Sequence, residues 1–579
     1  MQQSKNTTNL SELEIVANDS IKMTSALADI MEKFQLRSHL KFFDVLKSKG
    51  LALSSLLNIL VILPFYGLEN VYAMFKAGLN SPEFKGKKDA YYNAKNEENI
   101  NWRSLLLLHA KRFLYLTTKN IHIRGTGVTA FIFDDSLLEK TGKKIERVSV
   151  VNDHVSKRFI LGYKLLVCGF WDGQSFIPLD FSLHREKGNK QEELIKAYKK
   201  AKKEYQKAGK VLEKSSLTIK DKKSKLQVNK ELLKGNRTKT AEMKHNRAEH
   251  SYRRAEIKYD EAQKDFYKKE KLLNNAKRKI KRYYSKDRLY GLTPKERKEQ
   301  YKKVVSKNSF GHLRRKETDI DKITSAINML KRVIRKGIIA DYVLTDSWFF
   351  CHKLLEAIYK IKNGAIKLIS MVKMNNQIFT ICETGNLLSV KKIPEIYRKQ
   401  IKECRKFKSK YLKVACTYKG IRVNLFFVKM GKAKDWHLLL TTDLNLSFIR
   451  LMEIYQIRWS IEVFFKECKQ YLNLGGCESS NFDAQIADTT ISMIQHIMLT
   501  YYKRITYQQS LGGLFVNLQK DLIELDLVTK ILELVQELIK CLCDISGIDY
   551  MEVQKDLIQN ESVLRTFSRL LSNRFARAA

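Results

Sequence analysis

Four polar residues near the end of the chain have types and spacing that suit phosphate and metal chemistry. They lie in the stretch YQIRWSIEVFFKECK, residues 455–469, and are Tyr455, Arg458, Glu462 and Lys469. Their spacings of 3, 4 and 7 residues, at about 100° per residue, bring them within roughly 60° of one another on a helix. The opposite face carries apolar side chains suited to a core, namely Ile457, Ile461, Phe464 and Phe465. Such a stripe is either a row of surface ion pairs or part of a functional site.

Further acids end apolar runs elsewhere in the chain. Asp134 and Asp135 end the run in GVTAFIFDDS, and Asp346 ends the run in IIADYVLTDSWFF. Both runs are rich in β-branched and aromatic residues, which predicts strands. A single acid at the end of a strand is ordinarily a turn or cap residue. If one acid of each run converged with Glu462, the three carboxylates would repel one another unless a cation lay between them. Carboxylate oxygens of this kind suit Mg²⁺ or Mn²⁺.

The expected elements would bring these acids together. Residues 10–120 have helical spacing, and an antiparallel meander of three strands is expected from residue 126. A long charged segment follows. Then come a helix, the strand that ends at Asp346, a helix, a strand, a β-rich block over 376–444 and the helix with Glu462. When the long charged segment and the β-rich block are left out as insertions, this is the element order of a ribonuclease-H-like α/β fold. Its first and fourth strands are neighbours, so the three acids would converge.

The charged segment predicts an antiparallel coiled-coil hairpin. Apolar residues recur every seven positions in two arrays separated by KGNRTKT. The arrays are Tyr198, Tyr205, Leu212, Ile219, Leu226 and Leu233, then Tyr252, Tyr259, Phe266, Leu273 and Ile280, with Ala241, Ala248, Ala255 and Ala262 beside the second. Residues 187–290 contain 34 Lys and Arg against 14 Asp and Glu. The hairpin is expected to contact DNA, to contact another subunit, or to be solvated without a ligand.

The composition favours a polyanionic partner. The 579 residues have a formal net charge of +45 and a pI near 9.7, so nucleic acid is the first candidate and an anionic membrane surface the second. The run LALSSLLNILVILPFYG from Leu51 is short and interrupted, which predicts a buried helix and no membrane span. Nine scattered cysteines without a CxxC spacing predict free thiols in a reducing cytoplasm and no zinc site. KTGKK, residues 140–144, lacks the upstream glycine of a P-loop.

With these residues in view, the chain resembles bacterial DDE transposases of the insertion-sequence-four family. The family's Tyr-x2-Arg-x3-Glu-x6-Lys signature is matched at all four positions of the 455–469 stretch. DDSLLEKTGK resembles the segment with the family's first acid, YVLTDSWFF the segment with its second, and DWHLLLTTD the segment with a tryptophan that stacks on a flipped base. The resemblance covers roughly residues 100–475, and the coiled-coil hairpin is an addition to it.

The resemblance implies a role for each matched residue. Asp134, Asp346 and Glu462 would be the catalytic metal ligands, with Asp135 as the alternative first acid. Asp134 is preferred because the family's acid directly follows the strand. Two Mg²⁺ or Mn²⁺ ions would be the cofactors, and such ions about 3.5–4 Å apart can activate a water or a 3′-hydroxyl. The DNA-binding residues would be Tyr455, Arg458, Lys469 and Trp436, and a base-rich stripe with one acid suits a metal site beside phosphates.

We therefore expect a transposase that cuts the inverted-repeat ends of its element and joins the 3′ ends to target DNA, through hairpin ends. Its partners would be double-stranded DNA and a second copy in a homodimer, with no membrane, in the bacterial cytoplasm at the nucleoid. The alternatives are a non-enzymatic basic coiled-coil protein that organises nucleic acid, and a ribonuclease-H-like nuclease without strand transfer. The expected regions are 1–120 (helical, DNA-end binding), 121–189 (first part of the catalytic domain), 190–283 (coiled-coil hairpin), 284–375 (second part of the catalytic domain), 376–445 (β-rich insertion), 446–478 (helix with the third acid) and 479–579 (helical).

Overall fold

The fold is described from a computed structural model of the chain. It describes residues 26–66, 70–76, 86–153, 158–186, 189–235, 237–284, 294–431, 435–506 and 538–553, with positions 68, 156, 292, 433, 510 and 512–514. The expectations for residues 1–25 and for most of 507–579 lie outside these residues. The chain forms two compact units, the first made of residues 1–136, 165–182 and 303–579, and the second of 137–164 and 183–302.

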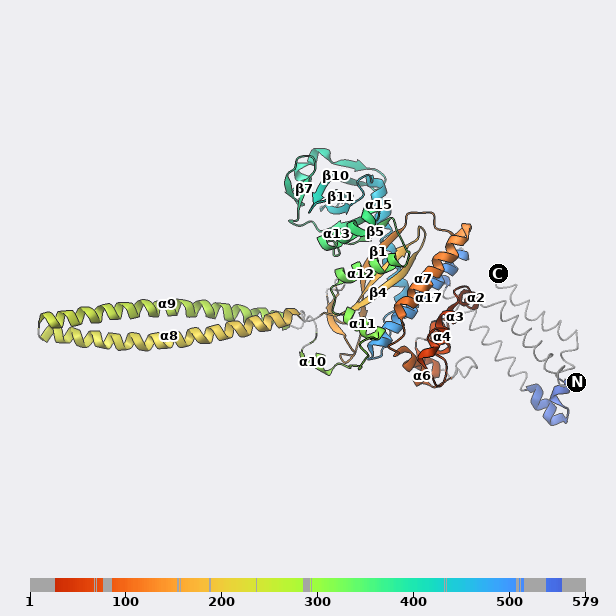
Figure 1. The fold of residues 1–579 in the computed structure, drawn as a ribbon, viewed down its shortest axis with the longest axis horizontal. Coiled ribbons are helices and arrows are strands. Elements are labelled where there is room, and N and C mark those ends of the chain that lie inside the picture. Colours follow the sequence, from red (N-terminus) through yellow and green to blue (C-terminus); the bar gives the residue numbers. More distant parts are fainter. Residues whose placement is uncertain are drawn as a thin grey trace. The chain divides into compact units, whose positions relative to one another are not determined.

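The N-terminal part of the first unit is helical, as its apolar spacing indicates (Figure 1). Its helices are α2 (Ala26–Lys33), α3 (Leu36–Lys41), α4 (Leu53–Ile62), α5 (Val71–Lys76), α6 (Lys88–Lys95) and α7 (Trp102–Lys119). α4 is the apolar run of the sequence and is almost entirely buried. α7 packs along α17 (Phe482–Ile505), which is buried over most of its length. Across the described residues, no helix is both long and apolar enough to cross a membrane.

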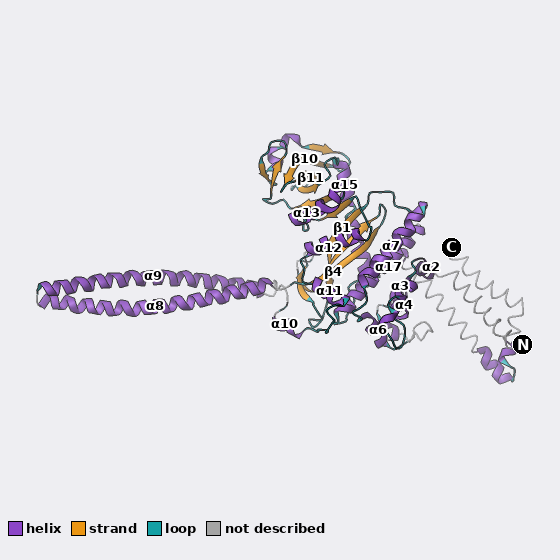
Figure 2. Ribbon diagram, in the orientation of Figure 1, coloured by secondary structure: helices purple, strands orange, loops and turns teal. Residues whose placement is uncertain are grey.

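A large mixed sheet forms the centre of the first unit (Figure 2). Its strands include β1 (Ala130–Glu139), β3 (Phe159–Trp171), β4 (Phe176–His184), β5 (Tyr342–Thr345) and β6 (Lys367–Val372). β1, β5 and β6 run parallel as neighbours, β3 lies beside β1, and β4 pairs with β3. The first four residues of β1 and the last three of β5 are buried, as expected for parallel strands covered on both faces. This mixed α/β arrangement is consistent with a ribonuclease-H-like transposase domain.

The β-rich block extends the same sheet beyond β6. Its strands are β7 (Ile378–Ile381), β8 (Leu387–Ser389), β9 (Lys402–Cys404), β10 (Ser409–Tyr418), β11 (Ile421–Met430) and β12 (His437–Thr441). β12 pairs antiparallel with β6, and the order then continues through β11, β10, β7 and β8. Tyr411 of β10 stacks on Phe448 at 4.0 Å between ring centroids. The block is therefore tied to the start of the helical segment that follows it.

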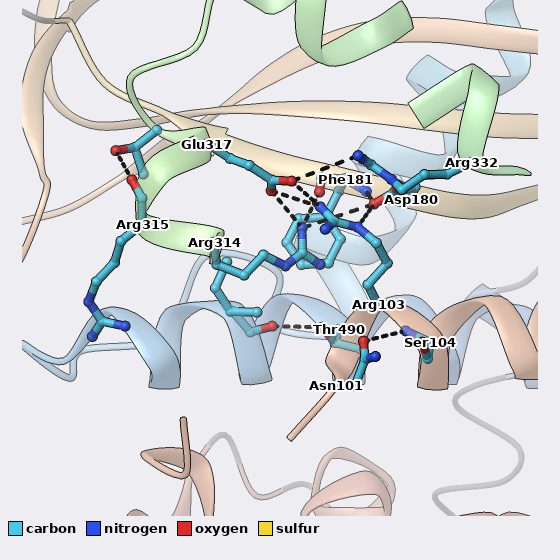
Figure 3. A network of polar contacts seen from close by, with 12 residues as sticks. Asn101, Arg103, Ser104, Asp180, Phe181, Arg314, Arg315, Glu317, Arg332 and Thr490 are labelled. Carbon is cyan, nitrogen blue, oxygen red and sulfur yellow. Dashed lines mark hydrogen bonds and ion pairs between the residues drawn. The ribbon is translucent and has the colours of Figure 1, made fainter. Parts of the chain in front are cut away.

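A buried ionic network joins a helix, a strand and two further helices of the first unit (Figure 3). It links α7 and β4 to α11 (Phe310–Glu317) and α12 (Lys322–Arg335). Asp180 accepts hydrogen bonds from Arg103 Nε at 2.8 Å and from Arg332 Nη2 at 2.7 Å, and Glu317 accepts from Arg103 Nη2 at 2.7 Å. Burial alone would raise the pKa of Asp180, but the charges of Arg103, Arg332 and Arg314 hold it below its usual range. The Asp180 carboxylate is therefore ionised, and its ion pairs connect β4 to α7 and α12.

The second unit contains the helical hairpin. Its described elements are β2 (Ser149–Asn152), which pairs antiparallel with the first residues of β3, then α8 (Asn189–Gly235), α9 (Lys239–Tyr284) and α10 (Pro294–Glu299). α8 and α9 lie side by side along their length (Figure 1). The heptad residues Tyr205 and Phe266 contact at 4.9 Å between ring centroids, and Ala255 and Leu273 are buried. Aromatic and alanine side chains thus form the seam between the two helices.

Candidate active site

Asp134 and Asp346 follow matched positions of two neighbouring strands. Phe133 of β1 and Thr345 of β5 are partners in the parallel register, so the residue after each lies at the same level of the two strands. Only β5 ends there. The expectation that Asp134 or Asp135 ends the first strand was wrong, because β1 continues beside β3 to Glu139. The side chain of Asp346 also caps the turn after β5, because its Oδ1 accepts the N–H of Trp348 at 2.9 Å. The two acids that the sequence places 212 residues apart are thus neighbours in the fold.

The Asp134 carboxyl is partly buried and carries a strongly shifted pKa. Burial is the main cause, and the negative charge of Asp346 adds to it, so that the pKa rises to about 7. Two favourable contacts oppose this rise: the backbone N–H of Asp135 donates to Oδ1 at 2.8 Å, and Arg458 Nη1 donates to Oδ2 at 2.9 Å. Burial and a neighbouring like charge both disfavour the ionised carboxyl, and a cation bound beside Asp134 and Asp346 would favour it.

Arg458 bridges Asp134 to Glu462. Its Nη2 donates to Glu462 Oε1 at 2.7 Å, while its Nη1 holds Asp134. The Arg458 side chain is only 12% exposed, and its Nε has no hydrogen-bond partner. Glu462 is 36% exposed. The guanidinium thus lies between the first and third predicted acids and pairs with both of them.

The segment with the four signature residues is not one continuous helix. α15 (Phe448–Gln456) ends before Arg458, and α16 (Trp459–Tyr471) begins after it. Tight turns join them, in which the N–H groups of Ile457, Arg458 and Ser460 bond to carbonyl groups three residues earlier. The expectation of a single straight helix was wrong at this point. The tighter turns rotate Tyr455 relative to Glu462, yet both still lie near Arg458.

Tyr455 and Lys469 lie on either side of the acids. The Tyr455 hydroxyl donates to the carbonyl of Thr345 at 3.3 Å, and burial raises its pKa to about 12. Lys469 Nζ donates to Ser136 Oγ, two residues after Asp134, at 2.8 Å. The described structure therefore gathers Tyr455, Arg458, Glu462 and Lys469 around the middle of β1 and the end of β5, where Asp134 and Asp346 lie.

Asp135 has a different set of neighbours from Asp134. Lys322, the first residue of α12, donates to Asp135 Oδ1 at 2.8 Å and lies 3.7 Å from the centre of the Trp348 ring. Successive side chains of a strand point to opposite faces, which explains the separation of the two acids. Sequence reasoning missed both Lys322 and Trp348. The available signals were a lysine directly after the cap residue Asp321 and a tryptophan two positions after Asp346.

Trp436 lies just before β12 and is half-buried. Lys429 of β11 places its Nζ 5.9 Å from the centre of the indole ring. The indole is therefore partly accessible and beside a cation, which is a setting that suits stacking against a nucleic-acid base.

The donor chemistry beside β1 and β5 fits a divalent metal ion. Asp134 and Asp346 supply carboxylate oxygens, and the pKa of Asp134 is raised mainly by burial and further by the charge of Asp346. Within the described ranges, no three His, Cys, Asp or Glu side chains are grouped closely enough to hold one ion. Arg458 accounts for this arrangement, because it occupies the space between Asp134 and Glu462.

Comparison with known proteins identifies the class. Residues 156–494, more than half of the chain, match the family described as the transposase DDE domain, and the chain belongs to that family. The matched stretch contains Asp346 and Glu462 and begins after Asp134. No curated protein matches the chain. The prediction of a DDE transposase is thereby confirmed at the level of the family.

Proposed function

We propose that the protein is an insertion-sequence transposase of the insertion-sequence-four family, which cuts DNA at the inverted-repeat ends of its element and joins the 3′ ends to target DNA. The matched register of Asp134 and Asp346, with Arg458 between Asp134 and Glu462, carries this proposal. Two copies, one at each end of the element, would act together as a homodimer.

Asp134, Asp346 and Glu462 are the proposed ligands of two Mg²⁺ or Mn²⁺ ions. When bound, such ions lower the pKa of the attacking hydroxyl or water and stabilise the leaving oxygen of a phosphodiester. Asp134 is preferred over Asp135 because Asp346 and Arg458 both act on Asp134, whereas Asp135 is paired with Lys322. The chain contributes the orientation of the carboxylates through the fixed spacing of β1 and β5.

The remaining signature residues are proposed to hold the phosphates beside the scissile bond. Arg458 can exchange its carboxylate partners for a phosphate, since a guanidinium binds either group through paired N–H donors. The Tyr455 hydroxyl stays protonated at neutral pH because its pKa is about 12, so it can donate a hydrogen bond to a phosphate oxygen. Lys469, at Ser136, would add a third positive or donating group on the same side.

Trp436 is proposed to stack on a base that is flipped out of the transposon end. This stacking would let a freed 3′-hydroxyl attack the opposite strand and form a hairpin end. The neighbouring Lys429 would meet the phosphate of the flipped nucleotide. The partial exposure of the indole and its cationic neighbour support this role.

The test is cleavage of a duplex that carries the DNA flanking the gene, with purified full-length protein and Mg²⁺. Replacement of Asp134, Asp346 or Glu462 by Ala should lower cleavage by several orders of magnitude and leave DNA binding intact. Asp135→Ala should have a milder effect. A protein that binds DNA without cutting it would instead be a nucleic-acid organiser, and one that cuts without joining would be a nuclease.

A further inference from the structure

Five lysines form a stripe on the outer face of the helical hairpin. They are Lys200, Lys203, Lys207, Lys210 and Lys214 of α8, and all five are exposed. Their alternating spacing of 3 and 4 residues keeps them within about 80° on the helix, roughly opposite the seam that contacts α9. We call this set the lysine stripe.

The lysines of the stripe form no ion pair with the acids that the structure describes. None of its five side chains lies within ion-pair distance of a carboxylate among the described residues. The nearby acid Glu204 is paired instead with Lys269 of α9, across the hairpin, at 3.1 Å. Of the five, only Lys200 and Lys207 feel the charge of Glu204, and after Lys269 they help to lower the pKa of that acid. Five positive charges over about 21 Å of helix therefore repel one another unless a polyanion lies against them.

The stripe is confined to the first half of α8 and does not simply reflect a basic helix. The same face continues along α8 with the same spacing but without a basic residue, as Leu217, Asp221, Ser224, Val228 and Glu231. Among the lysines of the second half of α8, Lys225 lies on the side of the stripe but is paired with Asp221 at 2.9 Å. The others, Lys220, Lys222, Lys223, Lys230 and Lys234, occupy other faces. A row of lysines that ends abruptly marks a contact surface of defined length.

We propose that the lysine stripe binds the phosphate backbone of double-stranded DNA. DNA presents one negative charge per about 1.7 Å of its axis, so a stripe about 21 Å long faces more phosphates than it has lysines. A helix that binds a membrane surface places an apolar face in the lipid, whereas the apolar side of α8 at this level, with Tyr205 and Ala208, is turned to the seam. The choice of DNA as the polyanion rests on the proposed function. The contact itself requires no cleavage.

The experiment measures binding of the full-length protein to a 40-base-pair duplex of arbitrary sequence in EDTA, by fluorescence anisotropy between 50 and 200 mM salt. Replacing all five stripe lysines by Gln should reduce the slope of log K against log salt by about 4, at about 0.9 per phosphate contact. The wild-type protein would then lose several hundred-fold more affinity over this salt range than the variant. Replacing the same five by Arg keeps the charge and should keep the slope.

The matched control changes five lysines of the second half of the same helix that lie off the stripe to Gln, namely Lys220, Lys222, Lys223, Lys230 and Lys234. It removes the same charge with the same substitution, and its slope should stay within about one contact of the wild type. Circular dichroism at 222 nm should be unchanged in all variants. Equal slopes for the stripe variant and the control would overturn the proposal. The proposal would also be overturned if the stripe variant lost binding to anionic lipid vesicles while its DNA binding stayed unchanged. A lower slope in a protein that never cuts DNA would support the stripe and refute the proposed function.

Discussion

Arg458 allows the arrangement of the site to be tested without measuring catalysis. In the structure it is bound to Asp134 at 2.9 Å and to Glu462 at 2.7 Å. A divalent ion that takes both carboxylates must first displace this guanidinium. Replacing Arg458 by Gln removes the competing charge. We therefore expect the variant to bind Mn²⁺ more tightly than the wild type in the absence of DNA, although its DNA cleavage should fall.

The size of the effect follows from the two contacts. A hydrogen bond to a charged partner contributes about 1.5–3 kcal/mol when it is shielded from water, which applies to the Asp134 contact. Glu462 is 36% exposed, so its pair with Arg458 is screened and contributes less than about 1 kcal/mol. A net release of about 2 kcal/mol corresponds to roughly thirtyfold in affinity. Loss of the positive charge also raises the pKa of Asp134 further above about 7, so the measurement is made at pH 8.5.

The assay is titration of Mn²⁺ into DNA-free protein, with free Mn²⁺ read from its electron paramagnetic resonance signal. The matched control is Arg450→Gln on α15, where the arginine pairs with the half-buried Glu453 at 3.1 Å and should not affect the metal ion. An Mn²⁺ affinity in Arg458→Gln that is equal to or weaker than that of the wild type would refute the view that Arg458 holds the place of the metal ions.

Three further predictions concern the surroundings of the site. Asp180→Asn leaves the guanidinium groups of the buried network with too few negative charges and should lower the free energy of unfolding by about 3–5 kcal/mol. The control is Asp221→Asn, which removes an exposed ion pair and should lower the free energy of unfolding by less than about 0.5 kcal/mol. Both losses are measured by urea denaturation, and equal losses for the two variants would contradict the role of the network. Burial lowers the pKa of His109 to about 4. The unfolded chain therefore binds a proton below about pH 6.5 that the folded chain excludes until about pH 4. The His109 imidazole should thus lower the free energy of unfolding by about 2 kcal/mol between pH 7 and pH 5. If His109→Gln loses as much unfolding free energy over this pH range as the wild type, His109 is not the cause. Trp436→Ala should spare the first nick of an end substrate and reduce hairpin formation, and a folded variant that forms hairpins at the normal rate would make Trp436 structural.

Much of the site could be predicted because its acids end apolar runs. Asp134 and Asp346 follow the buried residues that pair β1 with β5, so their neighbourhood depends on the order of the sheet, although β1 itself continues to Glu139. The seam of the hairpin could likewise be read from its heptads, since Tyr205 and Phe266 contact each other. The mixed α/β sheet and the transposase class are confirmed, and the assignment of individual roles stays a prediction.

Other features left no periodic signal in the sequence. The break at Ile457 and Arg458 depends on tight turns within a segment whose spacing is fully helical. The pair of Lys322 with Asp135 joins residues 187 positions apart, so neither residue alone indicates the other. The continuation of the sheet from β6 into β12 depends on strand pairing that the block's composition does not fix. These features arise from tertiary contacts, which override local preference.

The central claim is that the site with Asp134 of β1 and Asp346 after β5 cuts DNA at the ends of an insertion sequence. The most direct measurement incubates a plasmid carrying the gene and its flanking DNA with purified protein and Mg²⁺, and maps the broken ends. The account predicts that the wild type cuts at inverted repeats only when Mg²⁺ is present, and that Asp346→Ala binds the same DNA without cutting it. Cleavage by Asp346→Ala at the wild-type rate would contradict the account.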